Sequence, residues 1–298
     1  IPERKGEDYK RFITAMCSLG YRFDSRELVA ADYGAPTTRK RWYAIFQRDE
    51  KEIVWTEKAR TKDNWEPCGK YIDWSDLGKS IFDRKKPLAA ATQKRIANGI
   101  RKYILENGPY IVQDDRAVAF LIQYHGEQKA GESRGQLLSE PIKTIDTSNR
   151  YGLVTAFITK YYKSGIGQGG EEPIHTITTS PGHFGLVSAF LIKYYGSGGG
   201  QTVDRPLDTI TTKDRFGLVN VAINIKGEKY AIADIFLRML KPEELKLMQG
   251  FPEDYIINRD IEGKPHPIKE QVARIGNSVV PTMAEALVKA NCGCLKIG

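Results

Sequence analysis

The spacing of apolar side chains along the chain predicts a mixture of helices and strands. Apolar residues recur every three or four positions over residues 9–19, which indicates a helix. Two short apolar runs, over residues 27–31 and 42–46, flank a turn that contains glycine and proline and are typical of strands. A second helix is expected over residues 88–105. Its apolar face consists of Ile96, Ile100, Tyr103 and Ile104. The predicted fold class is therefore α/β.

The clearest internal feature is a unit that occurs three times between residues 119 and 219. Each copy opens with an Ala-Phe run, continues through a glycine-rich loop and ends with Gly-Leu-Val. The openings start at Ala119, Ala156 and Ala189, so the copies are 37 and 33 residues apart. Short β-branched and aromatic runs broken by Gly and Pro favour strands. We therefore predict three stacked β units that share one core.

Each copy also places a basic or potentially basic side chain before an aromatic residue, just ahead of its last strand. These residues are Arg150, His183 and Arg215, and Lys160 and Lys193 occupy equivalent positions in the second and third copies. Such side chains, beside hydroxyl-bearing and glycine-rich loops, suit contacts with phosphates and base edges of DNA. A plain β scaffold accounts for most of the apolar positions, so the prediction of DNA contact concerns these polar residues alone.

The charge of the chain agrees with a polyanionic partner but identifies it only weakly. The net charge is +8, and many soluble proteins carry as much. Residues 1–118 hold 24 Lys and Arg against 18 Asp and Glu, so most of the basic excess lies in the first third. Nucleic acid is the partner class that this distribution favours.

Histidine and cysteine positions argue against a metal site. The four histidines are scattered, and the four cysteines form no CxxC pair and no regular ligand spacing. We predict no metal and reduced thiols.

No apolar run approaches the length needed to cross a bilayer, so the expected location is the cytoplasm. The first residue is Ile1 and not Met, which suggests an excerpt of a longer polypeptide.

Three further segments carry motifs in a fixed order. Residues 31–41 read Ala-Asp-Tyr-Gly-Ala-Pro-Thr-Thr-Arg-Lys-Arg, residues 238–252 run from Arg-Met-Leu-Lys-Pro-Glu-Glu to Gln-Gly-Phe-Pro, and residues 271–281 contain Gly-Asn-Ser. Each segment alone also fits an ordinary turn or a capped helix. Together, in this order and with a long insert between the first two, they resemble the later sequence blocks of bacterial or phage-type DNA (cytosine-5) methyltransferases.

The resemblance implies an active-site role for two arginines and a cofactor role for one turn. Arg39 and Arg41 match the arginines that lie beside the flipped cytosine in this family, whereas Thr37 replaces the usual Gln. Asn277 and Ser278 match the stretch that closes the S-adenosylmethionine pocket. S-adenosylmethionine is the implied cofactor, and double-stranded DNA is the implied partner.

The resemblance also implies a division of the chain. Residues 1–50 and 270–298 are expected to be the end of a Rossmann-like methyltransferase sheet and its returning helix, a remnant of the catalytic domain. Residues 51–118 would form a basic helical connection, residues 119–220 a target-recognition region with three repeats, and residues 221–269 its closing segment.

The early blocks of the family do not precede the first motif. They are Phe-x-Gly-x-Gly for the cofactor, Pro-Cys for the nucleophile and Glu-Asn-Val for the base contact. Pro67-Cys68 and Glu106-Asn107 occur in the right mutual order, but Gly69 follows the cysteine where the family has Gln, and Glu106-Asn107 fits the end of a helix. We therefore expect the chain alone to lack the nucleophilic cysteine and to be inactive.

Three roles remain open at the level of the sequence. The chain can be the C-terminal part of a methyltransferase that a separate chain or an upstream half completes with the catalytic cysteine. It can be a non-catalytic DNA-binding specificity subunit. It can also be a degenerate prophage remnant without activity.

Overall fold

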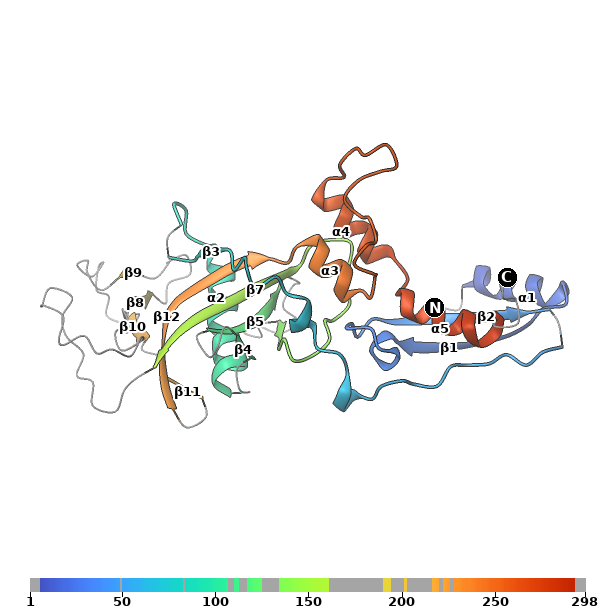
Figure 1. The fold of residues 1–298 in the computed structure, drawn as a ribbon, viewed down its shortest axis with the longest axis horizontal. Coiled ribbons are helices and arrows are strands. Elements are labelled where there is room, and N and C mark those ends of the chain that lie inside the picture. Colours follow the sequence, from blue (N-terminus) through green and yellow to red (C-terminus); the bar gives the residue numbers. More distant parts are fainter. Residues whose placement is uncertain are drawn as a thin grey trace, which may run out of the picture. The chain divides into compact units, whose positions relative to one another are not determined.

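A computed structural model shows two compact units, which we describe separately. Unit 1 consists of Ile1–Ile72, Ser139–Asn149 and Lys241–Gly298, and unit 2 of Asp73–Leu138 and Arg150–Leu240 (Figure 1). The described residues are 6–48, 50–82, 84–106, 110–112, 117–124, 134–160, 190–193, 201–202, 216–219, 222–225 and 228–292. The mixture of helices and strands expected from the sequence is confirmed.

Unit 1 is built on an antiparallel hairpin. Its elements are α1 (Glu7–Ser18), β1 (Arg22–Val29), η1 (Ala30–Tyr33), β2 (Lys40–Gln47), η2 (Lys62–Asn64), η3 (Cys68–Tyr71), α3 (Pro242–Met248), α4 (Ile268–Asn277) and α5 (Pro281–Cys292). β1 and β2 pair from Arg22 opposite Gln47 to Val29 opposite Lys40. The turn η1 ends at Gly34, whose φ of 92° lies in the left-handed region that favours glycine. The expected order of helix, strand, turn and strand is therefore confirmed.

Two helices cover opposite faces of the hairpin. Trp42 and Tyr43 are adjacent in β2, so their side chains leave the sheet on opposite faces. Trp42 meets Tyr9 of α1 at 5.6 Å between ring centroids, while Tyr43 packs against the buried cluster that contains Met283 of α5. α1 has no fully buried residue, and its Phe12 is half exposed. The hairpin is therefore covered more completely by α5 than by α1.

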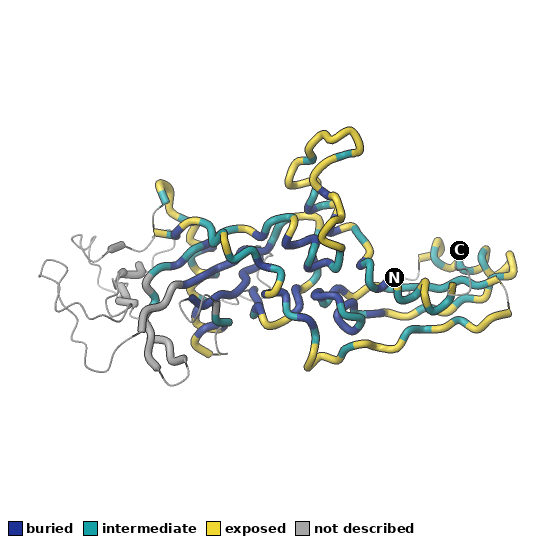
Figure 2. The backbone as a smooth tube through the Cα atoms, viewed as in Figure 1, coloured by how far each residue is buried: buried dark blue, intermediate teal, exposed yellow. Residues whose placement is uncertain are grey.

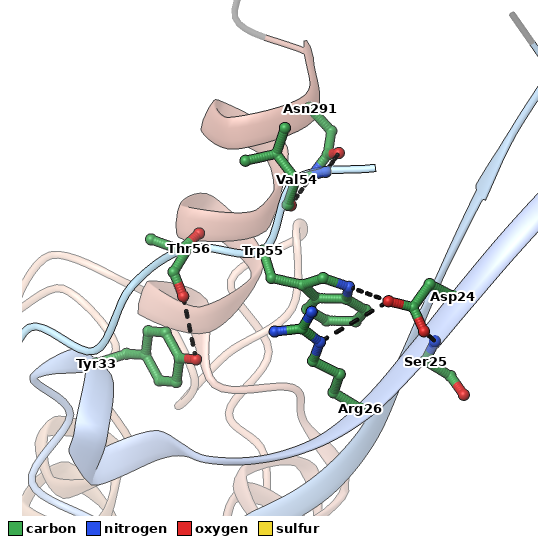
Figure 3. Close-up of polar contacts among 8 residues, drawn as sticks. All are labelled: Asp24, Ser25, Arg26, Tyr33, Val54, Trp55, Thr56 and Asn291. Carbon is green, nitrogen blue, oxygen red and sulfur yellow. Dashed lines mark hydrogen bonds and ion pairs between the residues drawn. The ribbon is translucent and has the colours of Figure 1, made fainter. Parts of the chain in front are cut away.

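An extended segment after β2 fastens α5 to the hairpin (Figure 3). The side-chain amide of Asn291 accepts a hydrogen bond from the N–H of Val54 (2.9 Å) and donates one to its carbonyl (2.8 Å). The indole N–H of Trp55 donates to Asp24 (2.7 Å), and the guanidinium of Arg26 lies 4.9 Å from the centre of the Trp55 ring. These contacts join the extended segment to both β1 and α5.

Unit 2 is an antiparallel sheet covered by one helical segment. Its elements are β3 (Lys79–Ser80), α2 (Ala90–Gly99), η4 (Ile100–Glu106), β4 (Tyr110–Val112), β5 (Ala117–Gln123), β6 (Gly135–Gln136), β7 (Tyr151–Lys160), β8 (Phe190–Lys193), β9 (Gln201–Thr202), β10 (Phe216–Val219), β11 (Ala222–Ile225) and β12 (Glu228–Met239). The main sheet has the order β11-β12-β7-β5-β4, with β3 paired to β12 and β6 to β5. β8, β9 and β10 form a separate sheet.

The core of unit 2 lies between the main sheet and the segment α2–η4. β5 is buried at every position, and Figure 2 shows the buried trace along β5 and the first part of β7. The four apolar residues expected on the inner face of the helix are all buried, so that prediction is confirmed. The second half of the segment is a π-helix, which the sequence pattern did not indicate. Gly99 marks the junction, where the ring of Phe120 takes the space that a Cβ would need.

The three repeat copies do not all lie in one sheet. The openings of the first two copies lie in β5 and β7, which pair directly, whereas the third opening lies in β8 of the separate sheet. Residues 139–149 of the first copy belong to unit 1, because the backbone of Ile142 is hydrogen-bonded to Pro36 and Thr38. Most of the other two copies lies outside the described residues, so a core shared by all three stays a prediction.

The two units differ from the division expected from the resemblance. Unit 1 contains more than residues 1–50 and 270–298, because the segment after β2 and the helix α3 pack within it. The expected connection 51–118 is divided at Ile72, since its later part supplies the helical cover and several strands of unit 2. The described sheet of unit 1 is an antiparallel pair, so the described residues contain no parallel strands of a Rossmann-like sheet.

Gly99→Ala should destabilise unit 2 even though alanine is the better helix former. The added Cβ would lie 2.1 Å from Cε2 of Phe120, and such overpacking typically costs about 1 to 3 kcal/mol. Urea unfolding followed by far-UV circular dichroism measures the change, with the exposed Ala97→Ser as the control in the same helix. In a Phe120→Leu background the Gly99→Ala loss should shrink. An undiminished loss there would mean that Phe120 is not the obstacle.

Candidate functional site

The motif segments meet in unit 1 at a buried arginine. Arg39 lies just before β2 and is 5% exposed. Its guanidinium donates to the carbonyl of Ile145 (2.8 Å) and to the carbonyl of Gly276 (2.7 Å), which lie 106 and 237 positions away along the chain. A buried cation is costly unless its donors are satisfied, and these two bonds satisfy part of the guanidinium. Arg39 therefore ties the first motif both to the third motif and to residues 139–149.

Position 276 requires glycine because two backbones approach each other closely there. A Cβ on Gly276 would lie 2.1 Å from the carbonyl oxygen of Asp146 and 2.7 Å from the backbone nitrogen of Thr147. Both atoms belong to backbone, which cannot move aside as the end of a flexible side chain can. The missing side chain thus allows the end of α4 to pack against residues 139–149, with the carbonyl of Gly276 within reach of Arg39.

The second motif reaches the same place through Gln249, which is fully buried at the end of α3. Its side-chain nitrogen donates to the carbonyl of Ile275 (3.4 Å) and to the hydroxyl of Ser278 (3.3 Å). The hydroxyl of Ser278 in turn donates to the carbonyl of Ile275 (2.7 Å). Gln249 therefore fixes the turn that ends α4. We call the cluster of Arg39, Gln249, Gly276 and Ser278 the motif junction.

Two arginines and a tyrosine follow one another on one face of β2. Arg39, Arg41 and Tyr43 occupy alternate positions, so they share a face of the strand. Burial lowers the pKa of Arg39, and the positive charge of Arg41 lowers it further, while the guanidinium remains protonated at neutral pH. Burial raises the pKa of Tyr43, so its phenol is neutral. Of these three side chains only Arg41 is exposed, so positive charge is accessible to an anionic or electron-rich ligand at that residue.

Arg41 differs from Arg39 in its exposure and in its contacts. It is exposed, and its guanidinium donates to the carbonyl of the adjacent Lys40 (2.7 Å). Within the described residues, neither arginine forms an ion pair with a carboxylate. A ligand can bind Arg41 without breaking a contact between distant segments. Arg39, in contrast, forms two such contacts, with Ile145 and Gly276.

The turn that the resemblance assigns to the cofactor has one exposed and one engaged side chain. Asn277 is exposed at the end of α4, whereas Ser278 is half-buried and its hydroxyl is hydrogen-bonded within the motif junction. The buried polar atoms of unit 1 without a hydrogen-bond partner among the described residues include two acceptors, Oε1 of Gln249 and Oγ1 of Thr282, beside the donors Nε of Arg39 and Nε1 of Trp42. Buried acceptors of this kind can accept hydrogen bonds from a ligand or from water.

The residues expected to contact DNA are described only in part. Arg150 is half-buried and donates to the carbonyl of Tyr124 (3.2 Å), so it also contributes to the structure of unit 2. Lys160 and Lys193 are the last residues of β7 and β8, and their side chains lie outside the described part of the chain. His183 and Arg215 lie outside the described residues altogether. Contact of these side chains with DNA stays a prediction.

Cys68 occupies a packing position in unit 1. Its side chain is completely buried, and this burial raises the pKa of the thiol far above its ordinary value. A thiol that stays protonated is a poor nucleophile. The backbone N–H of Cys68 donates to the carbonyl of Glu140 (2.9 Å) and so anchors residues 139–149 a second time. Cys17 and Cys292 are exposed and lie on α1 and α5.

The sequence matched two residues of the motif junction to the family motifs but assigned them no role. Gly276 and Gln249 belong to the matched motifs, yet the sequence alone does not indicate that two backbones approach each other closely at Gly276 or that the Gln249 amide is buried and bridges two groups.

Among the described residues, no group of three or more His, Cys, Asp or Glu side chains could hold a metal ion. No helix in the described part of the chain is long and apolar enough to span a membrane.

The sequence matches the family model described as C-5 cytosine-specific DNA methylase over residues 1–292. The chain therefore belongs to the C-5 cytosine-specific DNA methylase family. Among solved structures it is similar to the Entamoeba histolytica methyltransferase EhMeth, with 14% sequence identity and a TM-score of 0.39, a score too low to bear on the fold. That match covers 97% of this chain and 59% of the other, so the chain spans about three fifths of the length of that methyltransferase. No curated protein matches the chain.

Arg39→Lys should destabilise unit 1 by about 1 to 3 kcal/mol, because a single ammonium group cannot reach both carbonyls as the guanidinium does. The control is the same substitution two residues away: Arg41→Lys, at an exposed position, should change stability by less than about 0.5 kcal/mol. Tryptophan fluorescence during urea unfolding reports mainly on unit 1, which holds Trp42, Trp55 and Trp65. Equal losses in the two variants would refute the role given to Arg39.

Proposed function

We propose that the chain is the C-terminal, target-recognising part of a DNA (cytosine-5) methyltransferase. The complete enzyme would transfer a methyl group from S-adenosylmethionine to C5 of cytosine in double-stranded DNA. The observation that supports this proposal is the motif junction, where residues of three family motifs, up to 237 positions apart, are in direct hydrogen-bonding contact. Membership of the family over residues 1–292 supports the class of reaction.

The proposed chemistry begins from the low reactivity of cytosine, whose C5 is a poor nucleophile. The base leaves the duplex stack, and a cysteine thiolate of the upstream half adds to C6 and makes C5 enamine-like. Negative charge builds on the base during this addition. The exposed fork of Arg41 offers fixed hydrogen-bond donors to that charge, most simply at the O2 atom of cytosine. Arg39 acts as a positioning residue, because it holds the start of the strand that presents Arg41.

The residues around the turn after α4 fit the cofactor in part. S-adenosylmethionine carries its methyl group on a positively charged sulfonium, which makes that methyl electrophilic. Asn277 is exposed and can bind the cofactor, while Ser278 is held by Gln249 and sets the direction of the turn. The partnerless Oε1 of Gln249 and Oγ1 of Thr282 support a polar ligand in this part of unit 1.

The proposal needs a partner for catalysis. The catalytic cysteine and the remaining cofactor residues would come from an upstream half, on the same polypeptide or on a separate chain. A specificity subunit would bind DNA and never contribute a group to the reaction. A degenerate remnant would do neither. The two following experiments distinguish these roles.

The chain alone should transfer no methyl group to duplex DNA. Cys68 is a buried thiol with a raised pKa, and the exposed Cys17 and Cys292 have no motif context. Incorporation of label from S-adenosylmethionine into duplex DNA measures the activity, and addition of the upstream half should restore it. Turnover by the chain alone that Cys68→Ser abolishes would show that Cys68 is the nucleophile after all. Failure of the upstream half to restore activity would favour a specificity subunit or a remnant.

In the completed enzyme, Arg41→Lys should slow the chemical step about 100- to 1000-fold, since preorganised donors are worth about 3 to 4 kcal/mol and lysine lacks the planar fork. Single-turnover methylation measures the step, and nucleoside analysis identifies 5-methylcytosine as the product. The control is Lys40→Gln, which removes a neighbouring exposed cation and should leave the rate unchanged. An unchanged rate with Arg41→Lys would remove Arg41 from the active site, and N4-methylcytosine or N6-methyladenine would overturn the proposed reaction.

A further inference from the structure

Most of the net charge of the chain is concentrated on one short segment of unit 2. Residues 84–106 contain seven Lys and Arg and one Glu, which gives seven minus one, or +6, while the whole chain carries +8. The segment includes α2 and η4, the helical cover of the main sheet (Figure 1). Within unit 2 the apolar side of this segment packs against the sheet, while Arg84 donates to the carbonyl of Leu237 and Arg95 stacks on Tyr124. Among the described residues, the exposed Lys94 and Arg101 have no comparable role in the packing.

Five of the seven cations of this segment are exposed, whereas Arg84 and Arg95 are half-buried. The residues that pack inward are Ile96, Ile100, Tyr103 and Ile104. Lys94, Arg101 and Lys102 are exposed, and Arg95 is half-buried with its guanidinium 5.4 Å from the centre of the Tyr124 ring. Lys94 lies in the α-helical part of the segment and Arg101 in its π-helical part, and both side chains are exposed. We call Lys94, Arg95, Arg101 and Lys102 the basic helix face.

Within the described residues, little internal pairing offsets the charges of Lys94 and Arg101. Arg101 approaches Glu106 at 3.8 Å, but both side chains are more than half exposed, and such surface pairs contribute little to stability. Lys94 forms no ion pair with any residue in the described part of the chain. Lys94 and Arg101 therefore present positive charge to solvent on the helical cover of unit 2, and the apolar packing of that cover does not involve them.

We propose that the basic helix face binds the phosphate backbone of double-stranded DNA. This inference rests on the proposed function, because it takes a DNA duplex as the substrate of the chain. Cations that neutralise phosphates release condensed counterions, which favours binding without reading any base. The face would hold and orient the duplex, while the predicted contacts of the repeats would read its sequence. An acidic protein surface is the alternative ligand that the experiment must separate.

The test compares two variants of the full chain that lose the same charge at exposed positions. Lys94→Gln/Arg101→Gln removes two cations from the basic helix face, and Lys10→Gln/Lys269→Gln removes two from α1 and α4 of unit 1. Fluorescence polarisation of a labelled duplex is measured across a series of salt concentrations. The first variant should lose about tenfold or more in affinity near physiological salt, and its slope of log K against log salt should flatten by about 2. The unit 1 variant should keep the wild-type slope.

Each outcome decides between the inference and the function on which it rests. Wild-type binding to duplex DNA, with an unchanged slope in the Lys94/Arg101 variant, would overturn the inference and leave the proposed function intact. Equal flattening in both variants would overturn it too, because net charge and not a particular face would then govern binding. Poly-glutamate serves as the probe for an acidic protein surface. If the Lys94/Arg101 variant lost binding to poly-glutamate but kept its affinity for the duplex, the basic helix face would be assigned to an acidic protein. Absence of wild-type binding to duplex DNA at every salt concentration would count against the proposed function itself.

Discussion

Unit 1 depends on one buried guanidinium that must be satisfied by backbone carbonyls. Removing a cation from water is costly, and Arg39 recovers part of that cost from the carbonyls of Ile145 and Gly276. Both carbonyls must come within hydrogen-bonding distance, so α4 has to end against residues 139–149. That approach leaves no room for a Cβ at position 276. Glycine at 276 thus accompanies the buried charge of Arg39, which also helps the backbone bonds of Ile142 and Cys68 to hold residues 139–149 in unit 1.

The two arginines of the first motif lie two residues apart but differ in burial and in their contacts. Arg39 and Arg41 lie on the same face of β2, yet the first is buried between carbonyls and the second is exposed. Their mutual repulsion is tolerated because the guanidinium of Arg39 is fixed and that of Arg41 reaches solvent. A catalytic donor is effective when it does not have to reorganise as charge develops. In the proposed mechanism, the buried Arg39 would hold the start of β2 in place and so fix the position from which Arg41 acts.

The parts of the structure that the sequence could predict are those governed by local periodicity. The first helix, the hairpin and the inner face of α2–η4 follow from the alternation of apolar and polar side chains. The π-helical second half of that segment could not be foreseen, because the same apolar residues also fit an α-helix. The sequence also could not predict that residues 139–149 belong to unit 1. These residues are part of the first repeat copy, and the described strands of the repeats belong to unit 2. The motifs identified Arg39, but its burial depends on partners more than 100 positions away.

The path of the chain between the units bears on how such a protein can diversify. The interval from Arg150 to Leu240 belongs to unit 2, and it is held at both ends by residues of unit 1, Asn149 and Lys241. Closing a longer loop costs only about 0.6 kcal/mol for each doubling of its length. A change in the number of repeats inside this interval is therefore compatible with the hydrogen bonds of Arg39. Length variation within residues 150–240 is in this way decoupled from the geometry of the motif junction.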